Sequence, residues 1–230
     1  MTFKVEMHLH TLGNSRCAKV GHEDIVSIYS SLGYDAVTVT NHWNEYIARK
    51  YLSDDPVISV RKYIEGYEKM RKAANGKLRV FFGMELALGG DYYKPGSLRS
   101  AELLIYGMTA EEFSECGATL YEYGYDELKK LAHDRGWLVI QAHPYRERSK
   151  RIPVKYLDGL EIFNNNGRHS NKNVLARLRA KTHSLVGIAG SDFHQPEDAG
   201  AALIFDEKIS DEKALAAALA VGAFEVQKGN

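Results

Sequence analysis

Short apolar runs rich in β-branched and aromatic residues alternate along the chain with longer stretches of helical periodicity. The runs at residues 36–40, 137–142 and 159–163 read AVTVT, WLVIQA and GLEIF. Runs of this length and composition predict buried strands. We expect strands at residues 3–8, 36–40, 79–86, 102–106, 137–142, 159–163 and 185–189, and a late one at 201–205.

The stretches between these runs have the period of amphipathic helices. Gly136 directly follows the stretch at 125–135 and is the residue type expected just past a helix C-terminus. Strands and helices that alternate over the whole length predict one α/β domain, residues 1–230, built on a parallel sheet that is open or closed into a barrel. We expect helices at residues 23–32, 60–74, 125–135, 171–181 and 211–221.

Composition and charge narrow the functional classes. The 30 basic side chains of Lys and Arg balance 30 acidic ones, which disfavours a dedicated binder of nucleic acid or membrane surfaces. Cys17 and Cys116 form no CxxC pair, which favours a reducing, cytoplasmic setting. The N-terminal MTFKVEMHLH lacks the apolar core of a secretory signal, and no apolar run reaches transmembrane length.

Side chains with metal-ligand chemistry follow the predicted strands. His8 and His10 end the first strand, where residues two apart point to the same face. The carboxyl ends of parallel strands gather at one end of a barrel, so we expect the side chains that follow them to converge. The seven candidate ligands are His8, His10, His42, Glu85, His143, Asp192 and His194.

Imidazole and carboxylate ligands suit Zn, Mn or Fe, and a carboxylate such as Glu85 can bridge two ions. Taken singly, each residue has an ordinary interpretation: a surface HxH pair, a structural carboxylate or a core histidine. Their joint placement after strands favours metal binding. The other histidines are typical of surface or packing positions, with His169 left open: His22, His133, His169 and His183.

These segments resemble motifs of the PHP family, the polymerase and histidinol phosphatase domain. The matching segments are MHLHT at 7–11, TVTNH at 38–42, GME at 83–85, AHPYR at 142–146 and GSDFH at 190–194. The resemblance implies a distorted (β/α)7 TIM-like barrel, phosphoesterase chemistry and one to three divalent ions per chain. It also implies a first ion on His8, His10, Glu85 and Asp192, a second that shares Glu85 and takes His143, and a third on His42 and His194.

Two departures from the family pattern affect the second and third ions. The family often places an Asp or His a few residues after HxH, where this chain has TLGNSRCAK with Ser15 near the expected place. It also often places a His after the fourth strand, where Tyr106 stands in ELLIYGM. Water or a substrate oxygen could fill the two gaps, and so could Cys17 or Tyr106.

The chemistry expected of such a site is hydrolysis of a phosphate ester by a metal-bound hydroxide, with Asp192 or His194 carrying the proton. Arg16, Arg146 and Arg168 follow strand ends and could bind phosphate oxygens, or they could form ordinary ion pairs.

Glu161 and Asn164 end another predicted strand. They could orient a ligand histidine or be polar residues at the rim of the sheet.

Three alternatives are open. The missing ligands allow a degenerate PHP domain that serves as a non-catalytic scaffold or binding module. Relatives also include nucleases, although the neutral charge disfavours strong nucleic-acid binding. An amidohydrolase would carry a lysine beside the ligands, and none ends a predicted strand there. The favoured partner is a small phosphorylated substrate, with no membrane involved.

Overall fold

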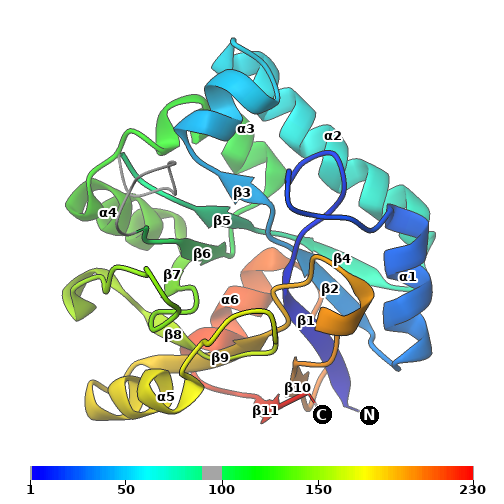
Figure 1. Cartoon of the computed structure of the whole chain (residues 1–230), viewed down its shortest axis with the longest axis vertical. Helices are drawn as coiled ribbons and strands as arrows, with labels where there is room; N and C mark the ends of the chain where they lie inside the picture. The colour runs from blue at the N-terminus through cyan, green and yellow to red at the C-terminus, as the bar shows by residue number, and fades with distance from the viewer. Residues whose placement is uncertain (1, 90–99, 230) are drawn as a thin grey trace.

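The computed structural model describes residues 2–89 and 100–229. Its strands lie at the centre of the molecule, and the helices lie around them (Figure 1). The strands are β1 (Phe3–Leu9), β2 (Ala36–Val39), β3 (His42–Trp43), β4 (Arg79–Phe82), β5 (Met84–Leu86), β6 (Leu103–Tyr106), β7 (Leu138–Gln141), β8 (Gly159–Asn164), β9 (Val186–Gly190), β10 (Ala202–Phe205) and β11 (Glu225–Gln227).

Local sequence signals account for the helix ends. The Asp55 side chain accepts hydrogen bonds from the first turn of α2, and Gly136 ends α4 with φ 67°, as predicted. Thr109 and Glu112 form a capping box on α3, a helix that the periodicity analysis missed. The α-helices are α1 (His22–Ser31), α2 (Pro56–Ala74), α3 (Ala110–Leu120), α4 (Tyr125–Arg135), α5 (Asn173–Thr182) and α6 (Glu212–Ala220).

The strands pair into two sheets, in the orders β11-β10-β1-β2-β4 and β3-β5-β6-β7-β8-β9. The predicted strand at 79–86 is divided at Gly83 into β4 and β5, which belong to different sheets. A backbone hydrogen bond connects the two sheets: Phe193 N, beyond the end of β9, donates to His8 O in β1 at 3.0 Å. The mixed α/β class is confirmed, while closure into a seven-stranded barrel remains a prediction.

The expectation of a wholly parallel arrangement is wrong at β6 and β10. Strand β6 runs antiparallel to both β5 and β7, and β10 runs antiparallel to β1. The amino end of β6 therefore lies beside the carboxyl ends of its neighbours. An alternating apolar pattern specifies a strand but not its direction, so the sequence analysis could not distinguish the two orientations.

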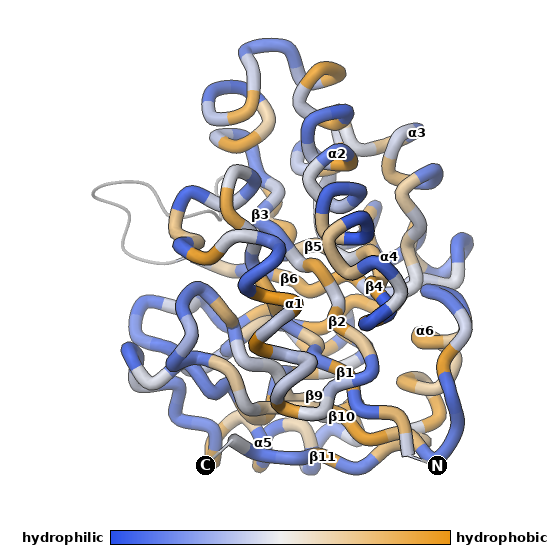
Figure 2. Tube along the Cα trace, turned by 90° about the vertical axis from the view of Figure 1, so that its right-hand side faces the viewer, coloured by the Kyte–Doolittle hydropathy of each residue, from blue (hydrophilic) through white to orange (hydrophobic). Residues whose placement is uncertain are grey.

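Both faces of the central strands are buried, in two separate apolar clusters. Phe81 and Leu104 belong to one cluster, whereas Phe82 and Leu103 belong to the other. Neighbouring residues on a strand point to opposite faces, so this alternation shows that each face packs against its own core. Figure 2 shows hydrophobic residues along the central strands. No helix in the described ranges combines the length and apolar character needed to cross a membrane.

Candidate metal centre

The structure brings the seven predicted ligands to the same end of the strands. Glu85, at the centre of β5, is the residue around which they gather. Its carboxylate oxygens lie 3.4 Å from His8 Nε2, 3.3 Å from His10 Nε2, 2.9 Å from His42 Nδ1 and 3.0 Å from His143 Nε2. Asp192 Oδ1 lies 3.5 Å from His8 Nε2, 3.4 Å from His10 Nε2 and 3.4 Å from His194 Nδ1.

The outer ring nitrogens of His8 and His10 are occupied by hydrogen bonds. His8 Nδ1 lies 2.9 Å from Glu161 Oε1, which can only accept when ionised. His10 Nδ1 lies 3.1 Å from Ser15 Oγ, whose own hydrogen is donated to Asn41 Oδ1 at 2.9 Å. In both rings the proton is therefore on Nδ1, and the lone pair of Nε2 points inward.

The inward-facing atoms of the first group are thus all acceptors. The two Nε2 atoms are 3.2 Å apart and face carboxylate oxygens of Glu85 and Asp192 in a buried space. Glu85 Oε2 also forms no hydrogen bond. Acceptors this close repel one another unless a proton or cation lies between them, so His8, His10, Glu85 and Asp192 fit a divalent metal ion.

Glu102 is a site residue that the sequence analysis missed. It directly precedes β6, and the reversed direction of that strand brings its carboxylate to 3.6 Å from His42 Nδ1 and 3.5 Å from His143 Nε2. The ligand-type atoms of His42, Glu85 and Glu102 lie within 4.8 Å of one another. Burial raises the pKa of Glu102 and the Glu85 carboxylate raises it further, so the pair favours a cation in the shared space.

Tyr106, considered above for the same gap, lies at the other end of β6. Its hydroxyl donates a hydrogen bond of 2.9 Å to the Met7 carbonyl inside the core. Had β6 been parallel, the sequence position of Tyr106 would have placed it with the ligands. Because β6 is antiparallel, Glu102 at its start lies with the ligands and Tyr106 at its end does not.

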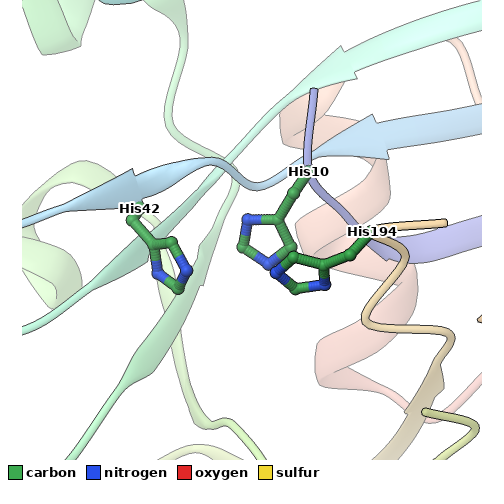
Figure 3. A group of neighbouring side chains, drawn as sticks. All are labelled: His10, His42 and His194. Atoms are coloured by element: carbon green, nitrogen blue, oxygen red, sulfur yellow. The ribbon is translucent and has the colours of Figure 1, made fainter. Parts of the chain in front are cut away.

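A third group contains His10, His42 and His194, whose candidate ligand atoms lie within 4.8 Å of one another (Figure 3). The ring centroid of His10 is 4.3 Å from that of His194 and 4.5 Å from that of His42. The Cys17 sulfur contacts the rings of His42 and His194. Burial raises the pKa of the Cys17 thiol, but the adjacent His42 and His194 outweigh that effect and lower it to about 4.

Two ligands have strained backbone conformations. Asp192 has φ 50° and His143 has φ 25°, a region that costs residues other than glycine about 1–3 kcal/mol. Hydrogen bonds stabilise both conformations. His143 N donates to Glu161 Oε2 at 2.8 Å, and the Asp192 carbonyl accepts from Asn166 Nδ2 at 3.1 Å.

Glu161 lies beneath the site, as one of its two sequence interpretations anticipated. Besides His8 and His143, it accepts a hydrogen bond of 2.9 Å from Asn164 Nδ2. A Cβ on Gly190 would lie 2.5 Å from the His8 Cβ and 2.8 Å from Glu161 Oε1. Glycine at this position in β9 therefore allows the close packing that holds the His8 ring.

Two of the three predicted phosphate-binding arginines form ion pairs. Arg146 contacts the Asp192 carboxylate, and Arg168 lies 3.0 Å from Asp198 Oδ2. Arg16 instead donates to the Tyr46 hydroxyl at 3.3 Å. Their role in substrate binding remains a prediction.

The remaining histidines divide as the sequence suggested. The side chain of His133 is 86% exposed, and neither it nor His22 or His183 lines the site cavity. His169, which the sequence left open, does line that cavity.

Five of the seven candidate ligands line a cavity of about 480 Å³, namely His42, Glu85, His143, Asp192 and His194. Arg146, Arg148 and Arg168 line it beside the ligands, together with Glu147 and His169, so three guanidinium groups lie next to the acceptor cluster. A larger cavity of about 800 Å³ lies at the amino ends of β1 and β4. It is lined by charged residues of both signs, and none of the His and acidic clusters found among the described residues lies in it.

Fold and site together define an α/β protein with a candidate divalent-metal centre. A family model described as PHP-associated matches residues 170–224. A two-domain protein from Bacteroides vulgatus that contains a predicted PHP-like metal-dependent phosphoesterase has a similar structure, with a TM-score of 0.67 and 18% identity. The match covers 100% of this chain and 65% of that protein, so the chain spans about two thirds of its relative's length.

A candidate metal-dependent phosphoesterase from Bifidobacterium adolescentis is also similar, with a TM-score of 0.50 and 14% identity over 92% of this chain and 93% of that one. No curated protein matches the chain in sequence. At these identities the two structures establish the shared fold. With the family model they support a PHP domain family for this chain, and the resemblance drawn from the motifs is confirmed.

Proposed function

We propose that this protein is a metal-dependent phosphoesterase that hydrolyses phosphate esters of small molecules or short nucleotides, on a distorted (β/α)7 barrel. The observation that carries the proposal is the buried cluster of acceptors formed by His8, His10, Glu85 and Asp192 at the base of a cavity lined by three guanidinium groups. The likeness in fold to the two phosphoesterase candidates supports it.

Divalent ions held by these residues and by His42, Glu102 and His143 would supply Lewis-acid activation of a phosphoryl oxygen and of water. Arg146 contacts Oδ2 of the Asp192 carboxylate, whereas Oδ1 faces the imidazoles. The same guanidinium donates a hydrogen bond of 3.1 Å to Asn164 Oδ1. The contact of Arg146 with Asp192 keeps one carboxylate oxygen directed at the imidazoles and leaves the other on the guanidinium.

His194 is suited to carry a proton at the edge of the cavity. Its side chain is 8% exposed, so it adjoins solvent while it contacts the ligand group. Its Nδ1 lies 2.8 Å from the Asp192 carbonyl, which can only accept, and this fixes the ring orientation. With no ion on the third group, Nε2 would be free to take up and return the proton.

Arg148 is the cation best placed to bind substrate phosphate. It lines the cavity from the loop after β7, and in the described part of the chain its guanidinium has no ion-pair partner. Arg146 and Arg168, in contrast, are already paired. A planar guanidinium binds phosphate oxygens bidentately, so Arg148→Met should raise KM more than it lowers kcat.

The test is to count metals by elemental mass spectrometry in protein purified without chelators, and then to assay p-nitrophenyl phosphate and bis(p-nitrophenyl) phosphate with Zn, Mn or Fe. The two substrates separate monoesterase from diesterase activity. Asp192→Asn should lower turnover by more than about 100-fold, because a ligand contributes at least as much as its supporting partners. Asp134→Asn, on an exposed carboxylate paired with Lys130, is the matched control.

Two results would contradict the proposal: a chain that binds no divalent metal, or full activity in Asp192→Asn. A chain that binds metal but hydrolyses neither ester would instead favour the scaffold interpretation.

A further inference from the structure

Cys17 lies at the third group of candidate ligands, in the loop between β1 and α1. Its Sγ is 3.0 Å from His194 Nε2 and 3.4 Å from His42 Nε2. The loop is held in place by backbone hydrogen bonds on both sides of the cysteine, from Ala18 N to Ser15 O at 3.1 Å and from Lys19 N to His194 O at 2.9 Å. The position of the sulfur between two imidazoles is therefore set by the fold.

The proton positions leave too few donors for this contact. His194 Nδ1 donates to a backbone carbonyl, so its Nε2 presents a lone pair to the sulfur. His42 Nδ1 faces carboxylates, Glu85 at 2.9 Å and Glu102 at 3.6 Å, so its Nε2 also presents a lone pair. A thiol satisfies at most one of these nitrogens, and a thiolate satisfies neither. Three electron-pair donors thus converge where at most one proton is available.

A second observation also points to a cation at this place. His10, His42 and His194 form a cluster of candidate metal ligands beside the sulfur. The neighbouring His10 contributes a further inward-facing Nε2, and the ligand atoms of the three histidines lie within 4.8 Å of one another. Cation binding would satisfy the histidines and the sulfur together.

We propose that the Cys17 thiolate is a metal ligand and forms, with His42 and His194, an ion position with mixed sulfur and nitrogen donors. The sulfur binds the ion as a thiolate, and a proton still present on it passes to solvent. The inference rests on the proposed function only in requiring that the chain bind divalent metal. Thiolate with imidazole favours Zn, Fe or Co over Mn and Mg, so this position should differ in metal preference from the carboxylate-rich group around Glu85.

Cobalt substitution tests this directly, because a thiolate bound to Co²⁺ gives a sulfur-to-metal charge-transfer band in the near ultraviolet. The whole chain is loaded with Co²⁺ as wild type, Cys17→Ser and Cys116→Ser. Cys116 is the matched control: it is the other cysteine, and its Sγ donates to Glu112 O at 3.3 Å within α3. Wild type and Cys116→Ser should show the band, and Cys17→Ser should lose it together with about one Co²⁺ per chain.

The outcomes separate the two proposals. If wild type binds Co²⁺ without the band, or if Cys17→Ser keeps it, the thiolate ligand is refuted and metal binding stands. If none of the three proteins binds Co²⁺, the proposed function fails as well. If Cys17→Ser folds poorly, alkylation of the wild-type protein tests the inference without a variant. Bound Zn²⁺ should slow alkylation of Cys17 by iodoacetamide and leave Cys116 unchanged, and equal rates at Cys17 with and without metal would overturn the inference.

Discussion

Replacement of Glu161 by glutamine isolates the hydrogen bonds that hold the first group of ligands. One carboxylate oxygen accepts from His8 Nδ1 at 2.9 Å, and the other accepts from His143 N at 2.8 Å and Asn164 Nδ2 at 2.9 Å. Glutamine has the same shape but a single acceptor oxygen. Whichever way the amide turns, its NH2 faces one set of donors.

Each orientation of the amide has a defined cost. With its oxygen on His143 N, the NH2 faces His8 Nδ1 and drives the ring proton to Nε2, where the metal should bind. With its oxygen on His8, the His143 amide is a buried donor without an acceptor, which costs about 1–3 kcal/mol. We therefore expect metal affinity to fall about 10–100-fold, or about 1.4–2.7 kcal/mol, and the melting temperature of the metal-free protein to fall by about 2–12 °C.

Isothermal titration with Zn²⁺ measures the affinity, and differential scanning calorimetry measures the melting temperature. Glu115→Gln is the control, because this exposed carboxylate pairs with Arg135 at 3.0 Å on the surface, where such pairs contribute about 0–1 kcal/mol. Wild-type affinity in Glu161→Gln would refute the claim that Glu161 fixes the His8 tautomer.

Three further changes test other parts of the structure. Tyr106→Phe should lower the free energy of unfolding by about 1–3 kcal/mol, since the buried Met7 carbonyl loses its donor, and leave the metal count unchanged; a lower count by elemental analysis would show that Tyr106 acts at the site. Glu102→Gln should lower the number of bound ions by about one, and an unchanged number would remove Glu102 from the ligand set. Burial raises the pKa of Glu112, but Lys213 and other hydrogen-bond partners hold it below 4.5. The stabilising effect of ionised Glu112 is therefore present above its unfolded-state pKa and is lost as pH falls through the lower folded-state pKa. The difference in unfolding free energy between wild type and Glu112→Gln, measured by urea titration, should shrink at acid pH. A difference that stays constant with pH would contradict the assignment.

Metal removal should lower thermal stability. A metal ion whose free concentration is 100 times its dissociation constant stabilises the folded state by about 2.7 kcal/mol. Calorimetry before and after chelation, followed by readdition of Zn²⁺, measures this difference, and an unchanged melting temperature would argue against binding to the folded state.

Much of the site could be predicted because its ligands are tied to local sequence patterns. His8 and His10 share a strand, so their two-residue spacing fixes them on one face whatever surrounds them. The Asp192 and His194 pair likewise follows a strand that apolar composition identifies. These segments were placed correctly because strand formation and side-chain alternation depend on near neighbours.

The sequence analysis missed Glu102 and named Cys17 as only one of several groups that could fill the gaps, for different reasons. Glu102 lies there because β6 runs antiparallel, and that direction depends on the partners of the strand rather than on its own residues. Cys17 lies in a loop without periodicity, and its contact with His194 depends on hydrogen bonds to a segment far along the chain.

The sequence by itself therefore determined most of the strands and the residue types at their ends, and it predicted a metal centre there, since each follows from short-range stereochemistry. Only the tertiary structure decided which end of β6 faces the ligands, which of the arginines that line the cavity are already paired with carboxylates, and which sulfur lies between two imidazoles. Those outcomes depend on pairing and packing between distant segments, and the free energy of such contacts is not a property of any one of them.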